Sequence, residues 1–580
     1  VKSLILDLDL NLRSPESQEE FSSRRQSVRS MGNNLTRRPE RIFDDGRGEG
    51  IGTVLINSGC KPSLICHCKL SRNDILKPII WQHMDDNDSH PQPTRPEVFS
   101  DPSGGSPRKL IRSRQIASKD PFGILPEELL CTILSKLDLK EAAKTSILSS
   151  TWRHTWKHYP KLTFDILTMC GGKYKTREQR HIQTPECVDR VHYVQQFVNI
   201  VNTILYQHQG KTIERFELRL TVDVLAQLFD QLDDWVRYAV SSRTKNLILH
   251  VSLTPLDVFH YKRYVFPVQL LDAGSCLQHI QLAHVLLKVP SQFVGFPNLR
   301  RLGLYSTRVS ASDMQCMVSN CPNIEWLDLF MVHLNDELKV DRPLSCLLYL
   351  RLSDCRVTTI ELNAPKLQTF IFQGRLVPIH LGESSELHNI VIHSYTLTLE
   401  QAICSFADAY PLVQRLTLCH TCALPKFPWR LDNTSSFSHL RYLQLLLNIF
   451  SEHANDILSI AYFLEAAPFL QEFDLEFRSS CMDVVPGPLR IFPYGQDKYK
   501  YLTIFRVFEF RGEKSKVELI VHVVQNAPSL ENLTIDPRRQ HVLDDSPASE
   551  AEEKRLSEIR HIAKSLIGKA FHLRSSTTFM

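Results

Sequence analysis

The stretch FPNLRRLGL, residues 296–304, decides how most of this chain folds. In a strand, successive side chains point to opposite faces, so Leu302 and Leu304 share one face. Their neighbours lie on the opposite face, and these are Arg301, Gly303 and Tyr305. The proline at the start ends whatever helix or turn comes before the strand. One such strand cannot bury its leucines alone, so it needs similar strands beside it.

The same pattern, x-P-x-L-x-x-L-x-L, recurs along the chain. Copies with the proline are CPNIEWLDL (321–329), APKLQTFIF (364–372), YPLVQRLTL (410–418), APFLQEFDL (467–475) and APSLENLTI (527–535). Copies without it are SCLQHIQL, SCLLYLRL, ELHNIVI and FSHLRYLQL. Their spacing of roughly 20 to 32 residues overlaps and slightly exceeds the period of leucine-rich repeats. The alternative is an ordinary α/β domain, but so many copies in sequence argue against it. We therefore expect an α/β solenoid, a horseshoe with parallel strands on its concave face.

Composition narrows the class of protein. The 580 residues are 43% hydrophobic and 23% charged, which is typical of a globular chain, with a net charge of +4. That charge does not indicate a nucleic-acid partner, and no apolar run is long enough to suggest a membrane partner. The fifteen cysteines are an odd number scattered through apolar stretches. They indicate free thiols and a location in the nucleus or cytoplasm.

The first 118 residues are rich in Ser, Arg, Asp, Pro and Gly. Such a composition buries too little apolar surface to offset the entropy of ordering, so we expect 1–118 to be mostly disordered. The cluster at Cys60, Cys66, His67 and Cys68 has no second pair of ligands, so no metal site is expected.

The character of the sequence changes at Asp120, where three short helices are predicted. Pro126 suits the first position of a helix, and Asp138 suits the cap of the next, with Glu141 completing a capping box. Trp152 and Trp156 share one face of the third helix because they are four residues apart. The apolar face of the first helix carries Leu129, Leu130, Ile133, Leu134 and Leu137. Some 40 residues cannot hide all of these groups, so part of the tryptophan and leucine surface should be exposed to a partner.

This segment resembles the F-box. The resemblance lies in Leu125-Pro126, the acidic pair 127–128, Ile133-Leu134-Ser135, Leu137, AAKTSILS, Trp152-Arg153 with Trp156, and the tail LTFD. Lys144 stands where arginine is usual, but no departure removes a large apolar group. The resemblance implies binding to the Skp-type adaptor of a cullin-RING (SCF) ubiquitin ligase. The residues expected to contact the adaptor are Leu125, Pro126, Leu130, Ile133, Leu134, Leu137, Leu148 and Trp152.

Resemblance to plant F-box/leucine-rich-repeat proteins extends over about residues 120–570. The stretch 501–537 resembles the FBD region that ends many of them. The expected domains are a disordered 1–118, an F-box at 119–165, leucine-rich repeats at 190–495, an FBD-like region at 496–540 and a capping helix at 548–570. That helix is predicted because Leu556, Ile559, Ala563, Leu566 and Ile567 fall on one face.

The function that this resemblance implies is substrate recognition for a ubiquitin ligase. No catalytic or phosphate-binding signature is present, so we expect a non-catalytic subunit without a cofactor. The concave face would bind an unknown protein target through outward side chains, namely Trp326, Asp328, Tyr349, Arg351 and Arg415. One alternative is a hormone-like small-molecule receptor that uses the same face, where Arg351, Arg415 and Arg441 could hold an anion. Another is a scaffold outside any ligase.

Overall fold

The computed structural model describes residues within one compact unit, Ser113–Met580. The described ranges are 126–145, 150–169, 187–252, 262–271, 276–394, 396–421, 436–449, 457–479, 498–537, 557, 561 and 576–579. The predicted disordered region 1–118 lies outside them, and so does the predicted capping helix 548–570 apart from Ser557 and His561.

The unit begins with the three expected helices. They are α3 (Glu127–Leu134), α4 (Leu139–Lys144) and α5 (Ser150–Thr155), followed by one 3-10 turn, η3 (Trp156–His158). Pro126 is the residue before α3, one position earlier than its sequence suggested. Asp138 caps α4 as predicted, because its Oδ1 accepts the Glu141 N–H at 2.8 Å. The Glu141 carboxylate accepts a hydrogen bond from Lys144 Nζ at 2.6 Å, in place of the expected capping box.

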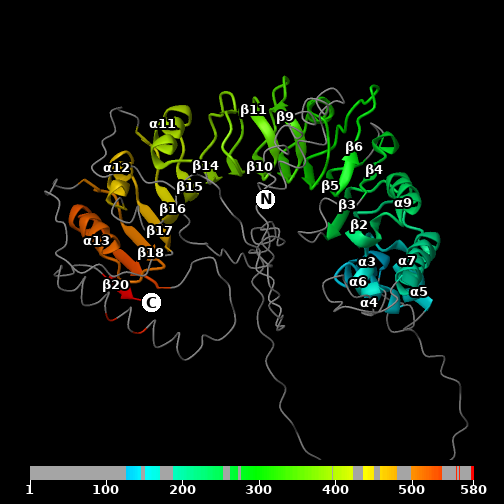
Figure 1. Ribbon diagram of the computed structural model, residues 1–580. Helices are drawn as coiled ribbons and strands as arrows, with labels where there is room; N and C mark the ends of the chain where they lie inside the picture. The colour runs from blue at the N-terminus through cyan, green and yellow to red at the C-terminus, as the bar shows by residue number, and fades with distance from the viewer. Residues whose placement is uncertain are drawn as a thin grey trace, which may run out of the picture. The chain divides into compact units, whose positions relative to one another are not determined.

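A single parallel sheet runs through the rest of the unit, with fifteen strands among the described residues. Figure 1 shows the strands side by side along the sheet. Each leucine repeat supplies one strand, so the predicted α/β solenoid with parallel strands is confirmed. The strands in spatial order are β1 (Lys161–Asp165), β2 (Arg215–Thr221), β3 (Asn246–Ser252), β5 (His279–Ala283), β7 (Arg301–Tyr305), β8 (Trp326–Phe330), β10 (Tyr349–Ser353), β12 (Thr369–Gln373), β14 (Asn389–His393), β15 (Arg415–Thr421), β16 (Tyr442–Ile449), β17 (Glu472–Ser479), β18 (Ile504–Phe508), β19 (Asn532–Ile535) and β20 (Ser576–Phe579).

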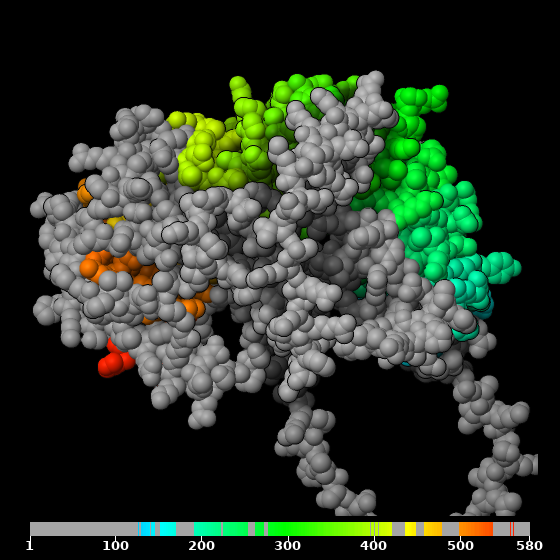
Figure 2. Space-filling model, in the orientation of Figure 1, coloured from blue at the N-terminus to red at the C-terminus, as the bar shows by residue number. Residues whose placement is uncertain are grey.

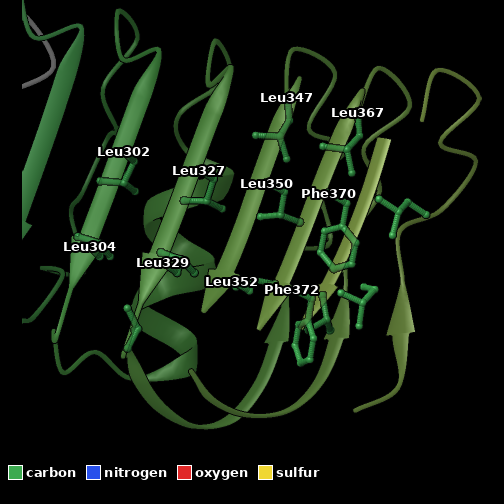
Figure 3. Packing of buried hydrophobic residues seen from close by; sticks show 14 of the residues in the cluster. Leu302, Leu304, Leu327, Leu329, Leu347, Leu350, Leu352, Leu367, Phe370 and Phe372 are labelled. Atoms are coloured by element: carbon green, nitrogen blue, oxygen red, sulfur yellow. The ribbon is translucent and has the colours of Figure 1, made fainter. Parts of the chain in front are cut away.

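The leucines of the repeats form the core on one side of this sheet. Figure 3 shows Leu302, Leu304 and their counterparts on neighbouring strands pointing to the same side. Leu302 and Leu304 are 1% and 0% exposed, and Leu327, Leu329, Leu350 and Leu352 are all 0% exposed. At about 25 cal/mol per Å² of apolar surface, this repeated burial is the main source of stability.

One backbone carbonyl before each strand keeps the strands aligned. The carbonyl of Arg300 accepts N–H groups from both Glu325, at 2.8 Å, and Trp326, at 3.0 Å. The carbonyls of Glu325, Leu348 and Gln368 each do the same for the next strand. The first residues of all the strands therefore form one row across the sheet.

The far end of several strands is marked by a left-handed residue. Ser306, Met331 and Asp354 have φ of 48°, 52° and 51°, and Gly374 occupies the same place after β12. Each donates its N–H to the last residue of the neighbouring strand, as Ser306 does to the Phe330 carbonyl at 2.7 Å. The chain then turns into short outer strands. These are β4 (Tyr264–Phe266) with β6 (Val285–Leu287), and β9 (His333–Lys339), β11 (Arg356–Glu361) and β13 (Ile379–His380).

Helices fill the other connections between strands. They are α6 (Ile166–Met169), α7 (Cys187–Gln207), α8 (Val222–Leu225), α9 (Phe229–Ser241), the 3-10 turn η5 (Val268–Leu270), α10 (Ala311–Ser319), α11 (Leu399–Ala409), α12 (Ile460–Glu465) and α13 (Lys514–Asn526). None of the helices in the described ranges is both long and apolar enough to cross a bilayer. In the space-filling view, the green and yellow-green repeats are visible beside one another where grey atoms do not cover them (Figure 2).

Candidate interaction surfaces

The helices α3, α4 and α5 with the turn η3, which we call the helical unit, have a buried side and an exposed side. Leu130 and Leu134, one turn apart on α3, are 2% and 0% exposed, and Trp152 of α5 is 4% exposed. The Tyr159 hydroxyl donates to the Leu137 carbonyl at 2.6 Å, which ties the turn after α3 to the segment before β1. The interior of this unit is thus packed and closed by polar contacts.

The exposed side carries an aliphatic stripe. Leu129, Ile133 and Leu137 follow one another at intervals of four residues and are 50%, 44% and 37% exposed. Pro126 is exposed beside them, at the start of α3. We call Leu129, Ile133 and Leu137 the α3 stripe. Leu129 and Ile133 lie on α3, and Leu137 lies in the turn that follows it. Three large aliphatic side chains exposed side by side are typical of a surface that a partner covers.

The structure divides the residues that the sequence assigned to the adaptor. Pro126, Ile133 and Leu137 lie on the surface. The expected exposure of the tryptophan surface is wrong, because Trp152 and Trp156 are 4% and 8% exposed. Leu130 and Leu134 are buried as well, so with Trp152 they shape the surface from beneath. Leu125 and Leu148 lie outside the described residues.

The reason for this burial is that the helical unit does not stand alone. Its tail LTFD lies within β1, which pairs with β2 as the first strand of the sheet. Lys157 and Tyr159 accept hydrogen bonds from Gln209 N at 2.8 Å and from His208 Nε2 at 3.0 Å. The tryptophans therefore join the continuous core of the repeats. Leu129, which sequence analysis placed on the apolar face but did not assign to the partner, is the most exposed member of the stripe.

The second surface is the concave face of the sheet, which carries a row of aligned side chains. The first residues of β8 and β10, Trp326 and Tyr349, are register partners. Their rings stack with centroids 3.5 Å apart and planes 10° from parallel. Farther along the same row, the Arg415 guanidinium lies 4.0 Å from the centre of the Tyr442 ring. We call the row from Trp326 through Tyr349, Thr369 and Asn389 to Arg415 the aromatic–arginine ladder.

A buried acid supports the ladder from the middle of β8. Asp328 is 1% exposed, and its Oδ2 accepts the Tyr305 hydroxyl at 2.9 Å. Arg351 Nη1 lies 3.7 Å from the same oxygen. Burial raises the pKa of Asp328 more than the charge of Arg351 lowers it. Gly303 leaves room for this contact, because a Cβ there would come within 2.9 Å of Tyr305 Cε2.

A related network lies on β16, β17 and β18. The Tyr442 hydroxyl donates to Asp474 Oδ2 at 3.1 Å, and Arg506 Nη1 donates to Asp474 Oδ1 at 2.8 Å. The same guanidinium also reaches Glu472 at 3.3 Å. In both networks a buried aspartate joins a tyrosine of the preceding strand to an arginine of the following strand. The second arginine is held by two carboxylates, whereas Arg351 is held loosely by one.

All five residues expected to bind the target lie on the concave face. Trp326, Tyr349 and Arg415 belong to the ladder, while Asp328 and Arg351 lie two residues farther along their strands. The three arginines expected to hold an anion do not converge. Arg351 and Arg415 are three strands apart, about 14 Å at 4.8 Å per strand, and Arg441 lies over the Phe469 ring at 5.2 Å.

In the described part of the chain, no group of histidine, cysteine, aspartate and glutamate side chains is placed to hold a metal ion. An open hollow of about 320 Å³ lies where the turns enter β12, β14, β15 and β16, outside the aromatic–arginine ladder. Its polar lining includes Gln368, His388, Gln414 and His439.

Comparison with known proteins identifies both the helical unit and the repeats. Three short helices that lead into a leucine-lined parallel sheet define an F-box protein with leucine-rich repeats. Residues 122–164 match the F-box domain, and residues 204–570 match the leucine-rich-repeat domain of the At1g61320/AtMIF1 family. The chain therefore belongs to the At1g61320/AtMIF1 leucine-rich-repeat family, and its features are those of a plant F-box/leucine-rich-repeat protein with an FBD-like region.

Similar proteins from Arabidopsis thaliana carry the same combination in their names. The chain is 24% identical over 429 residues to the F-box/FBD/LRR-repeat protein At1g13570, covering 72% of this chain and 91% of the relative. It is 24% identical over 480 residues to the FBD-associated F-box protein At1g66310, covering 77% and 95%. It is also 24% identical over 486 residues to F-box/LRR-repeat protein 13, covering 76% and 94%. The F-box and repeats support the role of an F-box substrate receptor.

Proposed function

We propose that this protein is the substrate-recognition subunit of an SCF-type E3 ubiquitin ligase. The α3 stripe docks on a Skp-type adaptor, which connects the chain to a cullin-RING ligase. The concave face of the repeats holds a protein target for ubiquitination by the other subunits. One observation carries this proposal. The F-box has an exposed aliphatic stripe, and β1 at its end is the first strand of the repeat sheet.

The geometry of the stripe supports adaptor docking. An amphipathic helix can place anchors one turn apart into an apolar groove. Leu129, Ile133 and Leu137 have this spacing and would lose their exposed surface beneath a partner. Leu130, Leu134 and Trp152 lie under the stripe and fix its position. Their role in adaptor binding is therefore to position the stripe.

The ladder supports target binding at the other surface. Aromatic side chains and arginine are enriched where protein interfaces concentrate their binding energy. Trp326 and Tyr349 are already held in place by their stacking, so little side-chain entropy remains to be lost on binding. Asp328 is buried and acts through Tyr305 and Arg351, so it positions the face.

The role needs no chemistry from this chain, since F-box/leucine-rich-repeat proteins are typically non-catalytic subunits. We propose that it acts in the nucleus, the cytoplasm or both. The seven cysteines that can be assigned in the described ranges are thiols, which fits a reducing compartment.

The test is co-purification of the full chain with a panel of plant Skp-type adaptors. Proximity labelling with and without proteasome inhibition then identifies targets whose levels rise when degradation stops. An adaptor complex that labels such targets supports the proposal. If the wild-type chain binds no adaptor in the panel, the ligase role is wrong and a scaffold role replaces it.

A further inference from the structure

A cluster of arginines lies away from both surfaces, where the main strands end and the chain turns into the outer sheet. Arg308, His333 and Arg356 each follow the end of a main strand by three residues, after β7, β8 and β10. Arg308 forms a parallel bridge with His333, and His333 is the register partner of Arg356. The repeat therefore stacks these three residues in a row about 10 Å long at about 4.8 Å per strand.

Arg263 joins this row from the segment before β4. Its Nη1 donates a hydrogen bond to the Ser306 carbonyl, two residues before Arg308. Its Nη2 is buried and has no hydrogen-bond partner among the described residues. A buried donor without an acceptor costs stability, so this atom marks a place where an acceptor would be favourable. We call Arg263, Arg308, His333 and Arg356 the arginine corner.

Among the described residues, no carboxylate pairs with the charges of the corner. Within the described ranges, none of its three arginines forms an ion pair with a carboxylate. Burial and the charge of Arg308 lower the pKa of Arg263 to about 10. Burial and then Arg356, Arg263 and Arg308 lower the pKa of His333 to about 4. At neutral pH the corner thus holds three guanidinium charges around an uncharged imidazole.

Elsewhere the repeats provide partners for comparable charges. Arg506 is held by Asp474 and Glu472, and Lys516, which is 2% exposed, is held by Glu513 at 2.7 Å. The corner differs because its repeated geometry gathers like charges and leaves them facing outward at Arg308 and Arg356, which are exposed. Repulsion of this kind is relieved by an anion.

We propose that the arginine corner is a binding site for a phosphoryl group. A guanidinium presents parallel N–H donors that match the oxygens of phosphate, and several guanidiniums suit a dianion better than a singly charged carboxylate. The buried Nη2 of Arg263 supplies one donor from inside, while Arg308 and Arg356 close on the group from the solvent side. The neutral His333 ring can donate one further N–H. The phosphoryl group comes from a phosphorylated side chain of the target or from a free phosphate compound.

The first experiment measures binding of inorganic phosphate to the full chain by calorimetry, against acetate at equal ionic strength. Arg308→Ala with Arg356→Ala should weaken phosphate binding at least about tenfold, because the loss of even one hydrogen bond from a charged group has about this effect. The matched control is Arg237→Ala with Arg300→Ala, two exposed arginines paired with acids elsewhere, which should leave binding unchanged. Equal affinity for acetate and phosphate, or equal loss in both double variants, would overturn the proposal.

A second readout separates this site from general attraction by positive charge. Bound phosphate should raise the pKa of His333 from about 4, measured by NMR on histidine-labelled protein, because its negative charge favours the imidazolium. The imidazole NMR signals of His154, which is exposed on α5, should stay in place when phosphate is added at constant pH. A His333 pKa that phosphate does not change would contradict binding at the corner.

The source of the phosphoryl group is distinguished by competition. Phosphoserine peptides that bind at least about tenfold more tightly than inorganic phosphate, and more tightly than their serine counterparts, indicate a phosphorylated target. Phosphate or pyrophosphate binding as tightly as any peptide indicates a free compound. If phosphate, pyrophosphate and phosphoserine peptides all fail to bind the corner, the proposal is wrong. These measurements use the chain without an adaptor, so their outcome does not depend on the ligase role.

Discussion

The α3 stripe and the aromatic–arginine ladder both leave large side chains partly in water, but they do so in different ways. The stripe consists of aliphatic side chains on α3 and the turn that follows it, between 37% and 50% exposed. The ladder crosses several strands, and its rings are half-buried against one another. Aliphatic side chains in water gain stability only when a partner covers them, whereas stacked rings and an arginine over a ring are already stabilised by their neighbours.

This difference indicates what each surface can recognise. The stripe offers shape and apolar area, which suits one constant partner. The ladder offers aromatic faces, a guanidinium and hydrogen-bonding side chains, which suits a partner chosen for its particular chemistry. The two surfaces should therefore fail independently when they are mutated.

The largest effect is expected from Leu129→Asp combined with Ile133→Asp. Each removes an exposed anchor worth about 2 kcal/mol, so adaptor affinity should fall by about three orders of magnitude if the two losses add. Thr132→Asp is the matched control, because it adds a charge to α3 without removing apolar surface. Co-purification with the adaptor measures the effect. Retention of the adaptor by the double variant would show that the stripe is not the docking surface.

Substitution of one tryptophan in each region, the buried Trp152 and the half-buried Trp326, tests whether the two regions differ in burial. Trp152→Ala should destabilise the helical unit by about 3 kcal/mol, since it leaves a large cavity in a packed core. Hydrogen exchange of peptides from residues 126–165 in the full chain should then become faster. Trp326→Ala, at a half-buried site, should leave that exchange unchanged. Faster exchange in the Trp326→Ala variant, or an unchanged exchange rate in the Trp152→Ala variant, would show that burial does not separate the two regions.

Removal of the ring stack should weaken only the ladder. Trp326→Ala with Tyr349→Ala is expected to lower target capture about 30-fold, which corresponds to about 2 kcal/mol, while adaptor binding stays the same. Quantitative proximity labelling measures target capture, and the adaptor in the same sample is the internal control. If capture persists while changes in the FBD-like region abolish it, the target is bound there instead.

The two aspartate networks should differ by about 1 kcal/mol. Asp474→Asn removes a carboxylate that binds Arg506 directly at 2.8 Å, so we expect a loss of about 2 kcal/mol. Asp328→Asn should cost about 1 kcal/mol, because burial already raises the pKa of Asp328 and an amide can still accept the Tyr305 hydroxyl. The midpoint of urea unfolding gives both values. A larger loss for Asp328 would mean that Arg351 is held more tightly than its 3.7 Å separation indicates.

Acidification should weaken the repeats without changing the α3 stripe. Burial, followed by the charges of Arg301 and Arg215, lowers the pKa of His279 to about 4, below its usual value near 6.5. The folded state then binds fewer protons, so stability present above pH 6.5 is lost as the pH falls through 6.5 toward 4. The melting temperature of the repeats should decrease by about 2 °C or more over this range, and less in His279→Gln. The side chains of the α3 stripe do not titrate, so their contribution to adaptor binding should not change.

Sequence patterns were sufficient to predict those parts of the fold that neighbouring residues determine by themselves. Alternation placed Leu302 and Leu304 in the core, and the spacing of Asp138 and Glu141 located the start of α4. The exposure of Trp152 was misjudged because its burial depends on β1 being part of the repeat sheet. The contact between Tyr305 and Asp328 depends on register between strands, which no single repeat reveals. Ser306 and Met331 take left-handed conformations without glycine, so their sequence gave no signal of the turn.

The carbonyl that precedes each strand has a consequence for how such chains can be lengthened or shortened. Because the carbonyls of Gln368 and His388 make the same pair of hydrogen bonds to the next strand, residues 369–388 form an interchangeable cassette. Excision of that cassette would let the Gln368 carbonyl accept the N–H groups of Gln414 and Arg415 that His388 now accepts. The ladder would become one step shorter, with Tyr349 two strands from Arg415 instead of three. Evolution and protein engineering can thus tune the reach of the concave face in whole steps.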